Sequence, residues 1–266
     1  MRRRTYINAG GIAVLLCFAS WPMTWFLPGG MPVVAALYAA DSTADALLDK
    51  ANKLRAAGQT DQARSTYAEA RKRYQQQTDL LGQAHVLLEL GNLERAAGQD
   101  KQAYEAYAQA EELYKRRGDR RGQAHVLLGM GDVERRLKNA QKARGLYAHA
   151  YKLYQLERDP LGQAHVLLGM GYVERGLDRI DQAHNFLFRA LTLYTTQGQS
   201  LGRAQVFFAL GQLYSSTDQA LAQRYFEQAA EQYRIVHMSD WAQRAEQRAH
   251  RLDGQSSLAS ESADPE

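Results

Sequence analysis

Cysteine is nearly absent from the 266-residue chain. The only one, Cys17, stands in the apolar run VLLCFAS. Every residue after it therefore folds without a disulfide and without a thiol nucleophile. A lipoprotein attachment site has small residues just before its cysteine, whereas Leu16 occupies that place here. We therefore interpret Cys17 as an ordinary apolar residue of the N-terminal segment.

The chain also has little net charge. Its formal charge is +4, but three of its 33 basic residues are Arg2, Arg3 and Arg4. From Asp41 onward, 30 basic residues stand against 29 acidic ones, so this part is close to neutral. Domains that bind nucleic acids carry a clustered basic excess. The charge balance therefore predicts no nucleic-acid partner.

Acidic residues are missing from the first forty positions, and this absence is typical of an export signal. The opening MRRR is followed by an uncharged stretch that contains the apolar segment 12–26. A basic start, a short apolar core and small residues near a cleavage point are the parts of a signal peptide. The alternative is an uncleaved anchor that crosses the membrane over 12–39, with the arginines left inside.

Both alternatives make residues 1–40 a targeting segment. Both also place the rest of the chain outside the cytoplasm. The expected location is the periplasm, or the periplasmic side of the inner membrane if the segment remains as an anchor.

One eleven-residue motif recurs at an interval of forty residues. Residues 81–91 read LGQAHVLLELG, 121–131 read RGQAHVLLGMG, 161–171 read LGQAHVLLGMG and 201–211 read LGRAQVFFALG. Each copy has the apolar spacing of a helix, and a second amphipathic helix follows after a short polar turn. Periods of about 20–50 residues indicate stacked supersecondary units, so the sequence predicts an array of helical hairpins.

Small and aromatic residues recur at equivalent positions of these hairpins. Gly91 and Ala103 permit close approach of two helices, Tyr107 fills the space beside them, and Ala110 admits the next hairpin. This pattern resembles the tetratricopeptide repeat, in which an apolar residue and Leu-Gly are followed by Ala, an aromatic residue and Ala. The predicted packing residues are Gly91, Ala103, Tyr107, Ala110, Gly131, Ala143, Tyr147, Ala150, Gly171, Ala183, Ala190 and Gly211.

The resemblance implies an all-α solenoid of helix-turn-helix repeats, wound as a right-handed superhelix. We expect this solenoid over residues 41–253, followed by a disordered tail at 254–266. Its five repeats are predicted at about 44–81, 82–121, 122–161, 162–201 and 202–237, with a capping helix at 239–253. A polar cap is expected because the last repeat of a solenoid otherwise exposes an apolar face.

Three features refine this prediction. The interval of 40 residues exceeds the usual tetratricopeptide period of about 34, which indicates a longer second helix or linker. Glu94, Glu134 and Glu174 replace an aromatic residue of the family and are expected at a solvated or inter-repeat edge. In the capping helix, Trp241, Ala245 and Ala249 are predicted to face inward.

The repeated histidines His85, His125 and His165 do not form a metal site by this reasoning. Equivalent helices of a stack lie about 10 Å or more apart, whereas zinc ligands converge to about 2 Å from one ion. The sequence also has no nucleophile elbow, no zinc-protease motif and no glycine-rich phosphate loop. We therefore predict neither an enzyme nor a bound metal or cofactor.

The resemblance places the first helices along a concave groove that binds a protein or peptide segment. An apolar strip in this groove would be flanked by a row of histidines and a row of arginines, which suits an acidic partner. The predicted groove residues are His85, Leu88, Asn92, Arg95, His125, Leu128, Asp132, Arg135, His165, Leu168, Tyr172, Arg175, Gln205, Phe208 and Gln212.

Two alternatives stay open. The histidines can simply begin a helix, and the arginines can pair with an adjacent glutamate or a neighbouring repeat. The expected function is a scaffold or adaptor that holds a partner protein. The alternative is a structural protein that assembles with its own copies, because nearly identical repeats can pair between chains.

Overall fold

The computed structural model describes residues 43–261, and side chains as far as Leu252. The chain divides into two units, Met1–Thr43 and Ala44–Glu266. The predicted targeting segment 1–40 lies outside the described residues. Among the helices that are described, none is long and apolar enough to cross a membrane.

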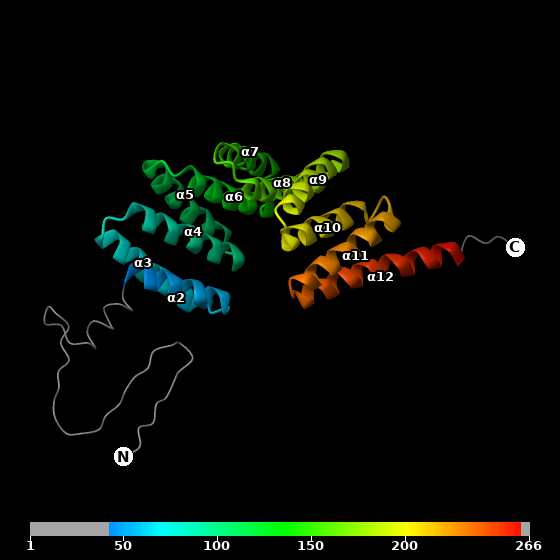
Figure 1. The fold of residues 1–266 in the computed structure, drawn as a ribbon, viewed down its shortest axis with the longest axis horizontal. Coiled ribbons are helices and arrows are strands. Elements are labelled where there is room, and N and C mark those ends of the chain that lie inside the picture. The colour runs from blue at the N-terminus through cyan, green and yellow to red at the C-terminus, as the bar shows by residue number, and fades with distance from the viewer. Residues whose placement is uncertain (1–42, 262–266) are drawn as a thin grey trace, which may run out of the picture. The chain divides into compact units, whose positions relative to one another are not determined.

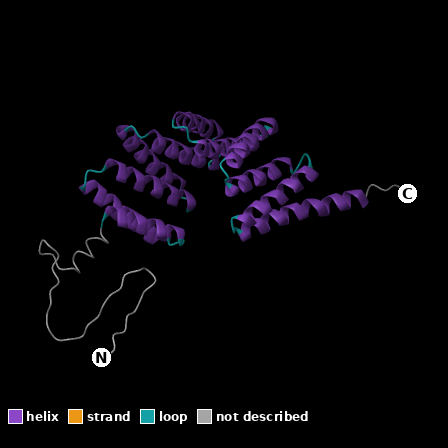
Figure 2. Cartoon of the chain, in the orientation of Figure 1, coloured by secondary structure: helices purple, strands orange, loops and turns teal. Residues whose placement is uncertain are grey.

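The second unit is built from helices alone, without a strand anywhere in the described range (Figures 1 and 2). The helices are α2 (Ala44–Ala56), α3 (Thr60–Gln76), α4 (Leu80–Ala96), α5 (Asp100–Arg117), α6 (Arg120–Arg136), α7 (Ala140–Leu156), α8 (Pro160–Gly176), α9 (Ile180–Thr196), α10 (Ser200–Tyr214), α11 (Gln219–Ile235) and α12 (Ser239–Glu261). This is the predicted all-α solenoid. Its handedness stays a prediction.

The helices form two layers. Each first helix (α2, α4, α6, α8, α10) packs on the second helix that follows it, and each second helix packs on the next first helix. First helices also contact one another directly, as α4 contacts α6 and α6 contacts α8. The second helices make no comparable contacts among themselves. The first helices therefore form the inner layer.

The forty-residue period is shared equally between the two helices. In the hairpin of α6 and α7, and again in that of α8 and α9, both helices have 17 residues. Which part of the hairpin is longer than in the usual repeat of about 34 residues stays a prediction.

Aspartates begin the first helices of three repeats. Asp119 and Asp159 stand at the N-caps of α6 and α8, where each side chain accepts the backbone N–H of the glycine three residues later at 2.9 Å. Asp79 does the same for α4. These bonds satisfy one of the free N–H groups at each helix start.

The glycine of the recurrent motif is required by a tyrosine of the preceding helix. A Cβ at Gly122 would lie 2.3 Å from the ring of Tyr114, and one at Gly162 would lie 2.2 Å from the ring of Tyr154. Real Cβ atoms do not approach a ring so closely, so the ring rests on bare backbone. The same contact recurs for Gly82 with Tyr74 and for Gly202 with Tyr194.

A second tyrosine contact joins neighbouring hairpins. Tyr107 is fully buried, and its ring blocks a Cβ both at Gly91 of its own hairpin and at Gly129 of the next. Tyr147 lies in the same way between Gly131 and Gly169. All twelve predicted packing residues are buried.

The three glutamates predicted at a solvated or inter-repeat edge are buried, with exposed fractions of 3%, 5% and 1% for Glu94, Glu134 and Glu174. Glu94 accepts two hydrogen bonds from Arg64 of the preceding repeat, at 2.6 and 2.9 Å. Glu174 pairs with Arg144 of the preceding repeat at 3.1 Å. The inter-repeat position is therefore correct for Glu94 and Glu174. The solvated position is wrong for all three, because a buried carboxylate needs a cation or donor beside it.

The last helix differs from its prediction in two ways. Helix α12 continues to Glu261 rather than ending at 253, because each residue added to an existing helix gains a hydrogen bond at low cost. Ala245 and Ala249 face inward as expected, but Trp241 is 39% exposed. Ala242 takes the inward position instead, buried with Ala229 and Ala230 of α11.

The tyrosine–glycine contact gives a direct stability test. Gly122→Ala should lower the free energy of unfolding by about 1–3 kcal/mol, because the new methyl group overpacks against Tyr114. Gly145→Ala is the matched control: this glycine is also inside a helix, but nothing lies within 4 Å of its Cβ position. Alanine should stabilise that site by up to about 1 kcal/mol. Urea unfolding followed by circular dichroism measures both changes, and equal effects would contradict the packing assignment.

Candidate functional site

The inner face of the first helices carries the predicted groove residues. Fourteen of the fifteen are half-buried or exposed there, and only Leu168 is buried and unavailable to a partner. Equivalent positions forty residues apart form rows across the repeats. Leu48, Leu88, Leu128, Leu168 and Phe208 form the apolar row.

Seven of the predicted residues converge on one hollow of about 480 Å³ between α2, α4 and α6. We call it the N-terminal hollow. Its apolar lining is Leu48, Leu88 and Leu128, each of them half-buried. The remaining lining residues are Asn52, His85, Glu89, Asn92, Arg95, His125, Gly129 and Asp132. The hollow thus combines an apolar strip with polar side chains, some of which carry positive or negative charge.

Asn52, Asn92 and Asp132 occupy equivalent positions of successive first helices, and tyrosines of the outer layer hold their side chains. Tyr107 donates its hydroxyl to Asn92 at 2.8 Å, and Tyr147 donates to Asp132 at 2.7 Å. Tyr67 makes the same bond to Asn52. These hydroxyls sit on buried rings, so the bonds hold the inner side chains in place.

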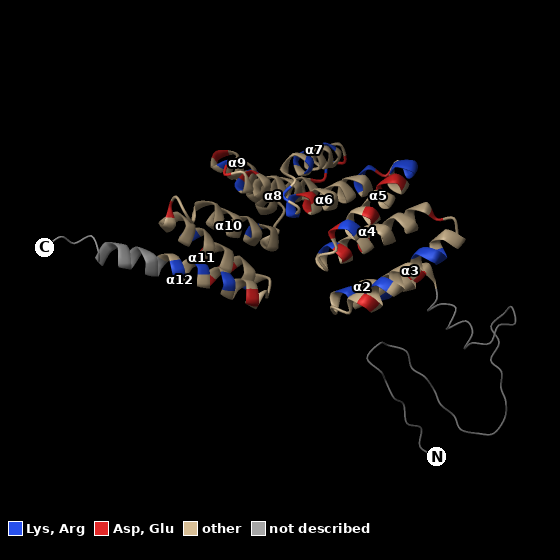
Figure 3. Cartoon of the chain, turned by 180° about the vertical axis from the view of Figure 1, so that it is seen from behind, with Lys and Arg blue, Asp and Glu red and all other residues tan. Residues whose placement is uncertain are grey.

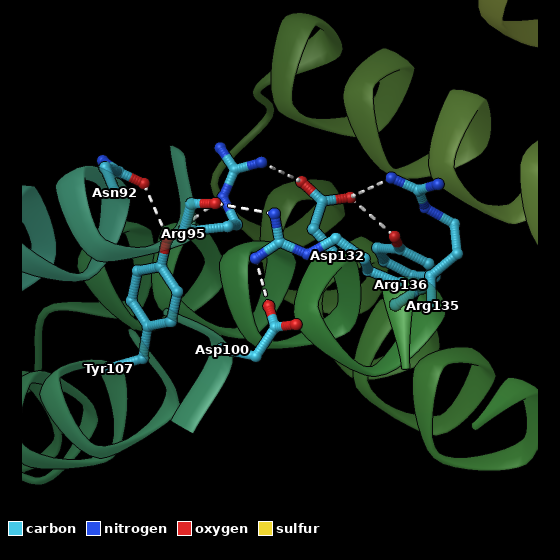
Figure 4. Close-up of polar contacts among 8 residues, drawn as sticks. Asn92, Arg95, Asp100, Tyr107, Asp132, Arg135 and Arg136 are labelled. Carbon is cyan, nitrogen blue, oxygen red and sulfur yellow. Dashed lines mark hydrogen bonds and ion pairs between the residues drawn. The ribbon is translucent and has the colours of Figure 1, made fainter. Parts of the chain in front are cut away.

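The predicted arginine row joins neighbouring repeats. Arg95 lies 3.3 Å from the Tyr107 hydroxyl and 3.5 Å from the carboxylate of Asp132 in the next repeat (Figure 4). Arg135 pairs with the same Asp132 at 3.7 Å and lies over the ring of Tyr172, 5.2 Å from its centre. A cation over an aromatic face is attracted by the ring quadrupole.

Arg175 continues the same pattern. It lies 5.3 Å from the centre of the Tyr172 ring and donates a hydrogen bond to Gln212 of the following repeat. Every predicted arginine therefore contacts a residue of the following repeat. The alternative that these arginines bridge repeats matches this geometry.

Arg136 is an inter-repeat contact that sequence reasoning missed. It donates to the backbone carbonyl of Arg95 at 2.7 Å and also pairs with Asp100 (Figure 4). Arg136 thus belongs to one repeat and holds the turn between α4 and α5 of the preceding repeat. Its position is Ala96 in the preceding repeat and Gly176 in the following one, so periodicity carries no signal for it.

The histidines lie at the rim of the inner face and pack against tyrosines. His125 Nδ1 is 2.9 Å from the hydroxyl of Tyr154, and the ring of His165 lies edge-on to Tyr194. Burial lowers the pKa of both His125 and His165 from the ordinary value. Within the described residues, no cluster of three or more His, Cys, Asp and Glu side chains could hold a metal ion.

Comparison with known families agrees with this architecture. The model of the family described as Tetratricopeptide repeat matches residues 122–196, which cover most of α6 and all of α7, α8 and α9. Residues 122–196 therefore contain tetratricopeptide repeats. No curated relative matches its sequence.

Solved structures with the same fold are distant in sequence. Aspartyl phosphate phosphatase F from Bacillus subtilis has a TM-score of 0.64 at 11% identity, with 79% of this chain and 59% of that one covered. A signal transduction ATPase with numerous domains and a tetratricopeptide repeat sensor, from Pyrococcus horikoshii, has a TM-score of 0.64 at 15% identity, with 84% and 36% covered.

A Rap protein complexed with Competence and Sporulation Factor has a TM-score of 0.58 at 12% identity, with 80% and 64% covered. The repeat protein therefore spans about a third to two thirds of the length of these three structures. At such low identity the likeness shows the fold.

The depressed histidine pKa values predict a dependence of stability on pH. The pKa of each histidine is lower in the folded protein than its unfolded value of about 6.5. Such a histidine contributes stability that is fully present above the unfolded pKa and is lost as the pH falls through the folded pKa. The double variant His125→Gln with His165→Gln lacks these groups. It should therefore lose less thermal stability than the wild type when the pH is lowered from about 7.5 to about 5. Glutamine is suitable because the fifth repeat has Gln205 at this position.

Thermal unfolding at a series of pH values measures the difference. His149→Gln is the control, because His149 lies on α7 in the outer layer and not on the inner face. If the double variant and the wild type lost stability in parallel, the packing of these histidines against tyrosines would have no energetic consequence.

Proposed function

We propose that the repeat protein is a non-enzymatic interaction module that binds a segment of a partner protein along the inner face. The observation that supports this most directly is the N-terminal hollow. Three leucines of successive repeats stand half-buried there, surrounded by side chains that donate and accept hydrogen bonds. Apolar surface rimmed by polar groups is typical of a site covered by a partner.

The spacing of the leucine row suits a linear segment. Leu48, Leu88 and Leu128 come from successive first helices, and packed helices lie about 8–10 Å apart. Three residues of an extended chain span about 10 Å, and so do seven residues of a helix. A partner with apolar side chains at every third position of a polyproline II stretch, which has three residues per turn, or at every seventh position of a helix, would match the row.

Two structural neighbours add support by their own descriptions. One is a Rap protein in complex with a factor, and another uses tetratricopeptide repeats as a sensor. Each fact belongs to that protein. For this chain they favour binding as the function of the inner face.

We place this binding outside the cytoplasm on the basis of the N-terminal sequence alone. Three arginines precede an uncharged stretch with an apolar core at 12–26. Cell fractionation and N-terminal sequencing of the protein from its native host test this. Cytoplasmic protein with an intact Met1 would refute export, whereas a start near residue 40 would identify a cleaved signal peptide.

Site-specific crosslinking tests the inner face. A photo-reactive amino acid in place of Leu88 or Leu128 should give the same crosslinked partner in the native host, because both side chains line the N-terminal hollow. The same replacement at Leu156 is the control, since this residue is 58% exposed at the end of α7 in the outer layer. Equal crosslinking from Leu156, or none from the two inner positions, would refute binding on this face.

Self-assembly is the alternative outcome of the same experiment. A crosslink from Leu88 to a second copy of the chain, with a mass that rises with concentration in sedimentation, would support it. The covering of α11 by Ala242 and Ala245 of α12 disfavours end-to-end stacking through that end, because the apolar surface there is already buried.

A further inference from the structure

The C-terminal end of the inner face holds a second hollow, of about 400 Å³, between α10 and α12. We call it the C-terminal hollow. Phe208 and Trp241 line it together with Arg244, Arg248 and Arg251, and the other two lining residues are glutamines. Among the residues described, it contains no acidic side chain.

The three arginines share one side of α12, since positions four and three residues apart lie one above the other on a helix. Lys and Arg positions recur along this helix in Figure 3. Arg244, Arg248 and Arg251 are exposed, and none forms an ion pair with any acidic side chain that the structure describes. The nearby Glu246 pairs instead with Arg234 of α11.

Aromatic rings hold two of these arginines in place. The Arg244 guanidinium lies 5.0 Å from the centre of the Trp241 ring, and that of Arg248 lies 5.7 Å from the centre of Phe208. Phe208 and Trp241 are themselves in edge-to-face contact at 6.2 Å. Stacked guanidinium groups lose less freedom when they bind an anion, because their orientation is already restricted.

The positive potential extends into the inner face. Burial lowers the pKa of the Arg175 guanidinium, and the neighbouring cations Arg135 and Arg248 lower it further. Gln212 connects the two regions, because it accepts from Arg175 and also lines the C-terminal hollow. The N-terminal hollow differs in containing the carboxylates of Glu89 and Asp132.

We propose that the C-terminal hollow binds the acidic part of a protein segment, with Asp or Glu carboxylates on Arg244, Arg248 and Arg251 and an adjacent apolar side chain on Trp241 and Phe208. Guanidinium groups recognise carboxylates through paired hydrogen bonds, and unpaired cations in a concave site favour an anion. This proposal rests on the proposed function. It adds that the partner segment carries carboxylates at the end that lies on α12.

A long polyanion fits less well. Nucleic acids bind along extended basic surfaces, whereas this cluster is local and the chain from Asp41 onward is nearly neutral. The small size of the hollow and its two aromatic rings suit one or two carboxylates beside an apolar side chain.

A phage-displayed library of random twelve-residue peptides, selected on the full-length protein, provides the probe. Selected peptides should be enriched in Asp and Glu over the unselected library. A fluorescein-labelled peptide from this selection is then compared with its Asn and Gln counterpart by fluorescence anisotropy. The acidic peptide should bind at least roughly tenfold more tightly, and added salt should weaken it.

Two matched variants place the binding. Arg244→Gln with Arg248→Gln and Arg251→Gln should weaken the acidic peptide roughly tenfold or more. Arg73→Gln with Arg116→Gln and Arg117→Gln removes the same charge from exposed positions of α3 and α5, and should change binding by less than about twofold. Circular dichroism confirms that both variants keep their helices.

The outcomes separate the two proposals. Selected peptides without acidic enrichment, or equal weakening by both triple variants, would overturn the acidic site and leave the binding module standing. Failure to select any peptide, together with no crosslink from Leu88, would overturn the binding module itself. Equal competition by a twelve-nucleotide thymidine oligonucleotide would show a general polyanion site and also overturn this proposal.

Discussion

The contact between a tyrosine ring and a glycine backbone is the constraint on which the rest of the structure depends. Each ring of the set Tyr74, Tyr114, Tyr154 and Tyr194 lies where a Cβ of the next repeat's glycine would be. A helix can approach so closely only if it lacks that atom. Because one such contact recurs every forty residues, the spacing between hairpins is uniform, and the same side of every first helix faces inward.

That uniform spacing determines which side chains of the inner face are free to bind a partner. Arg95 reaches Asp132, and Arg175 reaches Gln212, so these groups are used in joining repeats. What is left is the half-buried leucine row at one end and the arginines of α12 at the other. The two hollows therefore differ in character, one mainly apolar with mixed charges and one aromatic and basic.

Much of the fold was predictable because repetition gives the same evidence several times. The motif at 81–91 and its copies placed the hairpins, and the structure has its first helices at the same interval. The buried glutamates were harder to predict, since Glu94 depends on Arg64, thirty residues earlier. Periodicity locates Glu94 on its helix but does not indicate which cation covers it.

The sequence by itself determined the repeat, the places of the hairpins along the chain and the small residues between helices, because these follow from local spacing and from the size of a missing side chain. Only the tertiary structure decided how the polar residues are used. Arg95 and Arg248 look alike in sequence, yet one bridges two repeats and the other has no acidic partner among the described side chains. The difference arises from which side chains of the next helix lie within a few ångströms of the arginine. A repeat pattern does not specify these neighbours for the cap, because no repeat follows it.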